Sequence, residues 1–277
     1  MNSGQHYLGG LAHAVSLFQV NVTPTSNYKD KSMKLSSCLV TLALALCSCA
    51  TNASIFLDKV DHPKKVVILK IEGRIKYEDD LQFQKILNEI RSDGYKIKLN
   101  SVVLNTAGGS PSAAIAIGKI IRKENLNTYV GPKHNCGSAC IYILSSGIIR
   151  MAYGEVIVHR TTYEDGYPTE KLEKSLKQTD VNNANHLFEM GMSTQLVDAI
   201  RLTPNYTNWK LDDKEKRRWG VHGTERLYEE LWFRTTAKAK FYDTDVVRNF
   251  FYKFNDKCTK MAKEFKMTVF DCVKSEM

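Results

Sequence analysis

The sequence predicts an α/β fold in which helices cover a mainly parallel sheet, followed by a C-terminal helical extension. Between residues 66 and 159, short apolar runs typical of strands alternate with segments of helical periodicity, and the connections are short. This alternation is characteristic of parallel sheets. After residue 223 the apolar side chains recur three or four positions apart, which predicts a long amphipathic helix.

The first predicted pair is a strand over 66–73, closed by Gly73, and the helix that follows it. Asp79 or Asp80 can cap this helix, and Gly94 ends it. Helical spacing of the apolar residues supports the assignment. These residues are Leu81, Phe83, Ile86, Leu87 and Ile90.

The second pair is a strand over 101–106 and a helix that begins near Pro111, separated by a loop at 107–110. Proline suits the first turn of a helix, because the N–H that it lacks would have no partner there. A third strand follows at 127–131. The residues that this second helix is expected to bury are Ala113, Ile117, Ile120 and Ile121.

The remaining elements are a buried helix over 139–147, a strand over 154–159 that ends at a histidine, and helices over 169–190 and 192–202. The long C-terminal helix carries an apolar stripe, which more often packs in a core or an interface than around a cofactor. The stripe consists of Val247, Phe250, Phe251, Phe254, Cys258, Met261 and Phe265.

Residues 33–49, MKLSSCLVTLALALCSC, have the features of an export signal. Lys34 supplies a short positive region, and the apolar run at 39–46 is too short to span a bilayer as a stable helix. We therefore expect translation to start at Met33, and residues 1–53 to form an N-terminal extension with an export signal.

Two modes of cleavage fit the end of this signal. Leu46 to Cys49 resembles a lipobox in which Cys49 carries a lipid anchor to the membrane. Cleavage after Ala50 or Ala53, without a lipid, fits as well. Both modes place the chain in the periplasm or on the membrane of a bacterial envelope, as an exported protein.

Length and composition are those of one globular domain with appendages. The chain has 277 residues, 43% of them hydrophobic, and a formal net charge of +9. There is no block of like charge and no nucleic-acid-binding motif, so a solvated basic surface explains the charge and we expect no nucleic-acid partner. The expected divisions are a domain over 54–223 and a C-terminal helical extension over 224–277.

Seven cysteines are present, and three of them fall in the signal. Export makes disulfides available to the others. Cys258 with Cys272 would clip the C-terminal segment, and Cys136 with Cys140 would bridge if the backbone turns between them. A metal site of Cys136, Cys140 and His134 is the alternative, but the sequence offers no fourth ligand.

Candidate catalytic residues lie where the predicted strands end. Ser138 sits in HNCGSAC (134–140), just before a helix whose first N–H groups have no partners, so the N–H of Ala139 is a ready donor to an oxyanion. Gly108 and Gly109 offer a second backbone edge without a side chain. His159 ends the next strand, and a histidine is the usual base for a serine nucleophile.

Three motifs in this order resemble the Clp protease proteolytic subunit, within the wider Clp/crotonase superfamily. They are Asn105 to Gly109 before a helix, Gly137-Ser138-Ala139 opening a helix, and the strand Val156 to His159. The resemblance covers roughly residues 64–223 and is closest to the exported branch. It implies a spiral of ββα units, Ser138 as nucleophile, His159 as base, and backbone donors at Gly109 and Ala139.

The third catalytic residue is where the chain departs from the family. The family's aspartate position falls on Asn208, near the match to its Gly-hydrophobic element at 219–221. An asparagine carbonyl can orient an imidazole but cannot stabilise imidazolium by charge. The other candidates for this role are Asp165, Asp198 and Asp212. A serine–lysine pair with Lys133 is a further alternative.

The leading hypothesis is an exported serine hydrolase, a peptidase that acts on peptides or unfolded protein without ATP and without a cofactor. The alternative is a Clp-like binding or assembly module of the cell envelope with weak or no catalysis. A third class, crotonase-type chemistry on an acyl-CoA, has no source of coenzyme A outside the cytoplasm. The resemblance implies a homo-oligomer, although the helix at 169–190 is polar along much of its length.

Overall fold

A computed structural model describes residues 54–161, 170–204 and 206–277. The predicted export signal over 1–53, with Met33 and Cys49, lies outside the described residues, and so does Asp165. None of the helices in the described ranges is long and apolar enough to cross a membrane.

The described residues contain one mixed sheet with the strand order β8-β7-β5-β3-β4-β6-β9, and β2 joins β3 to β1. Five pairs of strands run parallel, and the antiparallel pairs are β1/β2, β6/β9 and β7/β8. The strands are β1 (Ser54–Asp61), β2 (Val66–Ile75), β3 (Lys96–Gly109), β4 (Asn127–Val130), β5 (Asn135–Gly137), β6 (Ile149–Ala152), β7 (Glu155–Val158), β8 (Trp209–Lys210) and β9 (Gly223–Thr224). The predicted mainly parallel α/β fold is confirmed.

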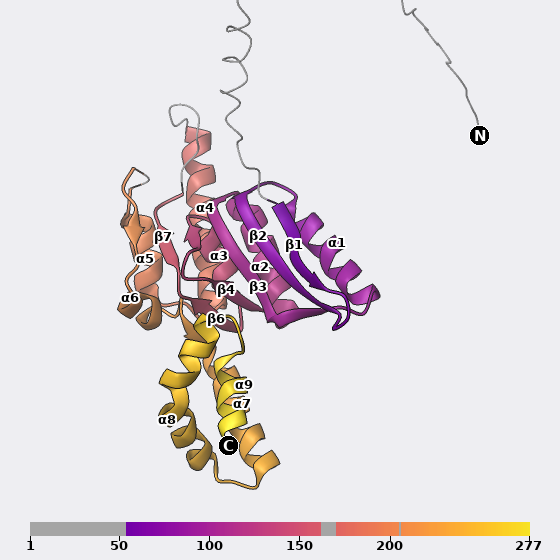
Figure 1. Ribbon diagram of the computed structural model, residues 1–277. Helices are drawn as coiled ribbons and strands as arrows, with labels where there is room; N and C mark the ends of the chain where they lie inside the picture. The colour runs from indigo at the N-terminus through magenta and orange to yellow at the C-terminus, as the bar shows by residue number, and fades with distance from the viewer. Residues whose placement is uncertain (1–53, 162–169, 205) are drawn as a thin grey trace, which may run out of the picture. The chain divides into compact units, whose positions relative to one another are not determined.

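The helices follow the strands in the predicted alternation, and three more make up the C-terminal extension (Figure 1). They are α1 (Asp79–Ser92), α2 (Pro111–Lys123), α3 (Cys140–Leu144), α4 (Glu170–Glu189), α5 (Thr194–Leu202), α6 (Asp213–Arg218), α7 (Arg226–Lys240), α8 (Thr244–Lys263) and α9 (Val269–Glu276). Pro111 occupies the first position of α2, as expected, and Ser110 caps this helix by accepting a hydrogen bond from the N–H of Ala113.

The two faces of β3, β4 and β6 are covered by different groups of helices. Val102 and Leu104 point into a hydrophobic cluster with α1, α2 and α3. Val103 lies between them in sequence and so points to the other face. There it joins Tyr129, Met151 and the apolar side chains of α7, α8 and α9 in a second cluster. The C-terminal extension therefore shares its core with the sheet.

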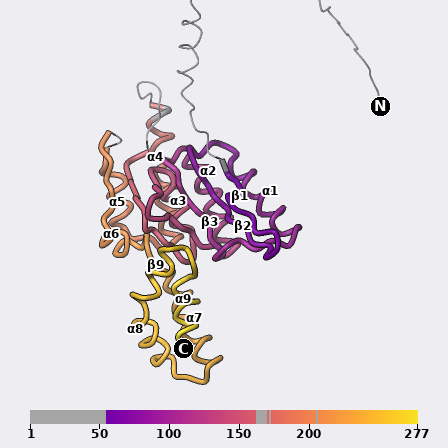
Figure 2. The backbone as a smooth tube through the Cα atoms, viewed as in Figure 1, coloured from indigo at the N-terminus to yellow at the C-terminus, as the bar shows by residue number. Residues whose placement is uncertain are grey.

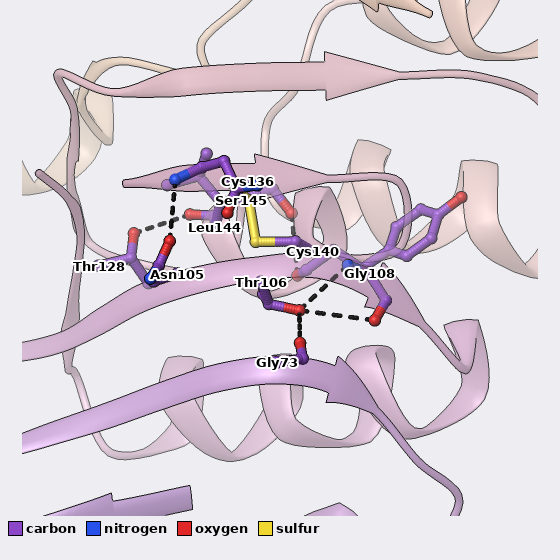
Figure 3. Close-up of a disulfide and its surroundings, with 11 residues drawn as sticks. Gly73, Asn105, Thr106, Gly108, Thr128, Cys136, Cys140, Leu144 and Ser145 are labelled. Atoms are coloured by element: carbon purple, nitrogen blue, oxygen red, sulfur yellow. Dashed lines mark hydrogen bonds between the residues drawn. A yellow bond between two sulfur atoms is a disulfide. The ribbon is translucent and has the colours of Figure 1, made fainter. Parts of the chain in front are cut away.

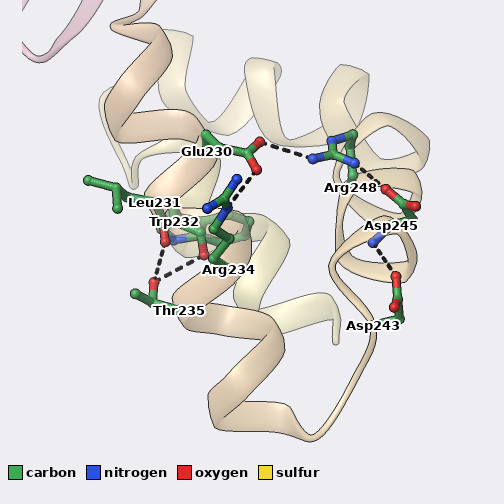
Figure 4. A network of polar contacts seen from close by, with 8 residues as sticks. All are labelled: Glu230, Leu231, Trp232, Arg234, Thr235, Asp243, Asp245 and Arg248. Carbon is green, nitrogen blue, oxygen red and sulfur yellow. Dashed lines mark hydrogen bonds and ion pairs between the residues drawn. The ribbon is translucent and has the colours of Figure 1, made fainter.

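The three helices of the extension are also joined to one another. Figure 2 follows the chain from β9 through α7, α8 and α9. A disulfide between Cys258 and Cys272 links α8 to α9, as expected from the sequence. In Figure 4 the carboxylate of Glu230 on α7 pairs with Arg234 and with Arg248 of α8, each at 2.9 Å. These ion pairs are exposed and add little stability, so the disulfide and the shared core hold the extension together.

The differences from the sequence prediction are local. Residues 107–109 belong to the end of β3 instead of a loop. Leu81 is 64% exposed on α1, and Ile120 on α2 is only partly buried. The eight-residue strand β1 was not predicted, and neither were β5, β6, β8 and β9. The last four span only two to four residues, which carry no period that can be recognised.

Candidate active site

Strands β3, β5 and β7 lie side by side and bring the three predicted motifs together. In the parallel register Cys136 of β5 is opposite Thr106 of β3 and Val156 of β7. If this register is continued by two residues, Ser138 lies opposite Gly108 of β3 on one side and Val158 of β7 on the other. His159 follows directly. The ends of three parallel strands thus converge at one edge of the sheet, where catalytic groups gather in such folds.

Ser138 lies on a strained turn between β5 and α3. Its φ is +50°, in the left-handed region that non-glycine residues rarely adopt. Its N–H donates to the carbonyl oxygen of Ile157 at 2.8 Å, which extends the ladder with β7 by one residue. The side chain is half-buried. Strain of this kind costs about 1–3 kcal/mol and is typical of functional sites.

A disulfide encloses this turn. Figure 3 shows the disulfide between Cys136 and Cys140. Both cysteines are fully buried, their Cα atoms lie 5.3 Å apart, and Ser138 lies midway between them in the sequence. The bridge that the sequence left open is therefore present. Both thiols are used, and the described residues contain no cluster of metal-ligating side chains at His134 or elsewhere.

The glycines at the end of β3 pack directly against the serine turn. A Cβ atom on Gly108 would lie 2.7 Å from Cβ of Ser138 and 3.0 Å from the backbone nitrogen of Ala139. A Cβ atom on Gly109 would lie 2.0 Å from the carbonyl oxygen of Ile75. Only residues without a side chain allow β3 to approach this closely.

Two polar side chains of β3 fix this arrangement, and both appear in Figure 3. The buried hydroxyl of Thr106 donates to the carbonyl of Gly73 and accepts the N–H of Gly108 at 3.0 Å. The side-chain oxygen of Asn105 accepts the N–H of Asn135 at 3.2 Å. These bonds tie β2, β3 and β5 together directly beneath Ser138.

The amide of Asn105 also contacts a carboxylate. Its nitrogen donates to Glu72 at 2.5 Å, and the ammonium of Lys70 lies 3.0 Å from the same carboxylate. The hydrogen bond from Lys70 lowers the pKa of Glu72, with a further contribution from Asn105. Glu72 therefore stays ionised and fixes which side of the Asn105 amide faces Asn135.

The N–H of Ala139 remains available as an oxyanion donor. Ala139 is buried beside the serine, and its N–H makes no hydrogen bond to any residue that the structure describes. Its carbonyl accepts from Tyr142 and starts α3. An unpaired N–H at the start of a helix favours negative charge. Gly109, the second predicted donor, lines the same cavity.

His159 is held by a backbone carbonyl. Its Nδ1 lies 2.9 Å from the carbonyl oxygen of Arg160. Because a carbonyl oxygen only accepts, Nδ1 must carry the proton, and Nε2 is then free to accept one. The N–H of Arg160 donates to the carbonyl of Thr203 at 2.8 Å, which anchors this segment to the end of α5.

The structure does not bring Asn208 to the imidazole. The antiparallel register pairs Val158 with Trp209, so Asn208 is the next residue opposite His159. Its side chain is exposed, lies outside the cavity lining and forms no hydrogen bond to the described residues. Within those residues, no carboxylate lies within ion-pair distance of His159. Asn208 remains a prediction for the third position.

One cavity of about 280 Å³ brings these groups together. Ser138, Ala139 and His159 line it together with both glycines of the β3 end. Tyr142 forms part of its wall, and burial raises the pKa of its hydroxyl, which keeps the side chain neutral. The other residues that line the cavity are Arg74, Ala107, Pro111, Ile141, Val158, Thr161 and Ile200.

The other candidates from the sequence lie elsewhere. Lys133 is exposed and does not line the cavity. Asp198 is exposed on α5, and Asp212 caps α6 by accepting from the N–H of Glu215 at 2.7 Å. The sequence does not point to Arg160, because its contribution is a main-chain carbonyl that any residue type would supply.

No protein-family model and no curated protein matches this chain. Among solved structures, it is similar to a mutant of ClpP1 from Listeria monocytogenes, at 17% identity and a TM-score of 0.44, over 58% of this chain and 90% of that one. It is also similar to a mutant of the membrane-bound stomatin-specific protease 1510-N, at 16% identity and a TM-score of 0.39, over 55% and 75%.

Proposed function

We propose that this chain is a serine hydrolase, a peptidase that is exported to a bacterial envelope and acts on peptides or unfolded protein without ATP. The observation that carries the proposal is the single cavity that holds Ser138, His159 and the N–H of Ala139. A hydroxyl, an imidazole with a free Nε2 and an oxyanion donor are the parts that acyl transfer requires.

In the proposed reaction, Nε2 of His159 takes the proton of Ser138 as its oxygen attacks the scissile carbonyl. The negative charge that develops on the carbonyl oxygen is held by the N–H groups of Ala139 and Gly109. The imidazolium then gives the proton to the leaving amine. In the second half of the reaction, His159 takes a proton from water as the water attacks the acyl-enzyme carbonyl. The imidazolium then returns the proton to Ser138 and the acid product leaves.

The carbonyl of Arg160 orients the imidazole but brings only a partial negative charge. It therefore stabilises the imidazolium less than a carboxylate would. We expect slow turnover for this reason. The described lining of the cavity is mainly apolar and small, and Arg74 and His159 are its residues that can carry a charge. We propose short or unfolded peptide segments as the substrate class.

The test is hydrolysis of unfolded casein and of a mixed peptide library without ATP. Wild type is expected to cleave both, and Ser138→Ala and His159→Ala are each expected to lose about 10³-fold or more. Asp198→Ala, an exposed position on α5 outside the cavity, is the control. Cleavage that survives in Ser138→Ala would remove this proposal.

The second candidate is a non-catalytic binding or assembly module. The observation that favours it is the absence of a carboxylate at His159 among the described residues. Several apolar side chains of the extension are also exposed, including Leu231 at 51% and Phe241 at 96%. If Ser138→Ala leaves the cellular phenotype intact while removal of residues 240–277 abolishes it, this candidate replaces the hydrolase.

A further inference from the structure

A second cavity, remote in sequence from the serine turn, is lined by arginines. It has a volume of about 430 Å³ and lies between the α4–α5 turn, the end of α6 and the start of α7. The arginines are Arg150, Arg217, Arg218 and Arg226, and Glu225 is the one carboxylate in the lining. Like charges gathered around one space repel each other unless an anion lies between them.

The deepest of these cations is not fully hydrogen-bonded. Arg150 is 4% exposed, and its Nη1 donates to the carbonyls of Ser145, Gly147 and Met190 at 3.3 to 3.4 Å. Its Nε is buried and has no partner. A buried, unpaired N–H of a cation is costly, and a bound water or ion is one arrangement that removes the cost.

A half-buried arginine next to the cavity, outside its lining, adds to the positive charge. Arg122 of α2 donates from Nε to the sulfur of Met190 at 3.3 Å, and its buried Nη2 has no partner. Arg122 lies close enough to lower the pKa of Arg150, although burial is the larger cause. Met190 thus lies between two arginines that each keep one unpaired N–H.

Glu225 offsets this positive charge only in part: its charge raises the pKa of Arg150 and of Arg122, but for both arginines burial, which lowers the pKa, is the larger cause. Both of its carboxylate oxygens are used to cap α7, through the N–H groups of Leu227 at 3.2 Å and Tyr228 at 3.3 Å. In the described parts of the chain, no carboxylate lies within 4.0 Å of the five arginines. The protein thus provides far more positive than negative charge here.

We propose that this arginine cavity binds a multiply charged phosphate anion, such as a pyrophosphate group. Guanidinium groups hold phosphate oxygens through paired N–H donors, and several arginines suit several negative charges. The ligand would join β6 of the sheet to α6 and to the start of α7. Binding would therefore fasten the C-terminal extension to the rest of the chain, independently of Ser138.

His222 provides a local reporter of binding. It lines the same cavity, and its Nδ1 accepts the N–H of Ala152 at 3.1 Å. Burial first and the charge of Arg217 second lower its pKa to about 4. An anion beside Arg217 offsets that charge, so the pKa of His222 should rise when the cavity is occupied.

The experiment is calorimetric titration of the full chain with pyrophosphate, inorganic phosphate and citrate at constant ionic strength. Saturable one-to-one binding of pyrophosphate is expected, with a rise in the melting temperature of roughly 5–10 °C at one hundred times Kd. The site variant changes only exposed residues, so that it folds: Arg217→Gln, Arg218→Gln and Arg226→Gln together. It should bind at least about tenfold more weakly.

The matched control removes the same number of charges elsewhere, with Lys214→Gln, Lys238→Gln and Lys240→Gln, all exposed and outside the cavity. The control variant should bind pyrophosphate as the wild type does. In both of these proteins, the pKa of His222 measured by proton NMR should rise when pyrophosphate is bound. Absence of saturable binding, equal weakening in both variants, or tighter binding of citrate than of pyrophosphate would each overturn the phosphate site.

Discussion

Replacement of Gly108 by alanine tests the packing of the β3 end against the serine turn while leaving the chemical groups of Ser138 and His159 in the chain. The added methyl would lie 2.6 Å from the carbonyl oxygen of Gly137, 2.7 Å from Cβ of Ser138 and 3.0 Å from the nitrogen of Ala139. The last distance matters most, because an oxyanion must lie about 2.7–3.1 Å from its donor. The methyl would therefore crowd the space next to this N–H group.

The expected cost can be separated into two parts. Gly108 has a φ of +105°, and a side chain in that region costs about 1–2 kcal/mol. The close contacts are with backbone and with a short side chain, which cannot move away, and overpacking of this kind costs about 1–3 kcal/mol. Gly108→Ala should therefore destabilise the fold by about 2–5 kcal/mol and lower the acylation rate about 10²–10³-fold.

Two control glycines isolate the contact from the backbone strain. Gly191 and Gly223 have φ values of +76° and +132°, on either side of Gly108, and an added Cβ atom would meet nothing within 4 Å at either position. Gly191→Ala and Gly223→Ala should lose only about 1–2 kcal/mol and keep wild-type reaction with a fluorophosphonate. Stability is measured by urea unfolding. Wild-type acylation in a folded Gly108→Ala variant would refute the oxyanion assignment.

Three further predictions concern the extension, the buried histidine and the imidazole partner. Replacement of Cys258 and Cys272 by alanine should lower the free energy of urea unfolding by about 3 kcal/mol, because the disulfide no longer closes its loop in the unfolded chain. Acylation of the folded variant should be unchanged, and a slower acylation would contradict the prediction. The pKa of His222 is about 4 in the folded protein and about 6.5 in the unfolded chain. The free energy of unfolding is therefore highest above pH 6.5 and should fall by about 3 kcal/mol as the pH is lowered to 4. His222→Asn should flatten this pH dependence, and an unaltered slope would contradict it. Arg160→Pro removes the N–H that holds the carbonyl on Nδ1 and should slow acylation about 10²-fold, whereas Arg160→Ala and Asn208→Ala should stay within about threefold; a large loss in Asn208→Ala would return the third position to that side chain.

The sequence predicted the fold where residues follow a period. The helix from Asp79 and the strand that ends at His159 are set by local patterns of apolar residues, and the structure reproduces both closely. Short strands such as β5 could not be found this way, since three residues define no period. Yet β5 is the strand that carries the serine turn between Gly108 and His159.

The parts of the site that require a particular residue type could be predicted from the sequence. The main-chain group that holds the imidazole could not. Glycine is required at position 108 because any Cβ atom would meet Ser138, so the sequence reveals it. The carbonyl of Arg160 could come from any residue type and was missed, whereas the N–H of Ala139 was predicted because it lies at the start of a helix. The arginine cavity could not be predicted either, because Arg150, Arg217 and Arg226 come together only through the packing of β6, α6 and the start of α7.

The central claim is that Ser138 is an activated nucleophile, and mapping a fluorophosphonate adduct tests it most directly. Wild-type protein is treated with the probe, digested, and the modified peptide is sequenced by tandem mass spectrometry. One adduct per chain on Ser138, lost in His159→Ala, is the predicted result. An unmodified Ser138 in folded protein, or labelling that survives the loss of His159, would contradict the account.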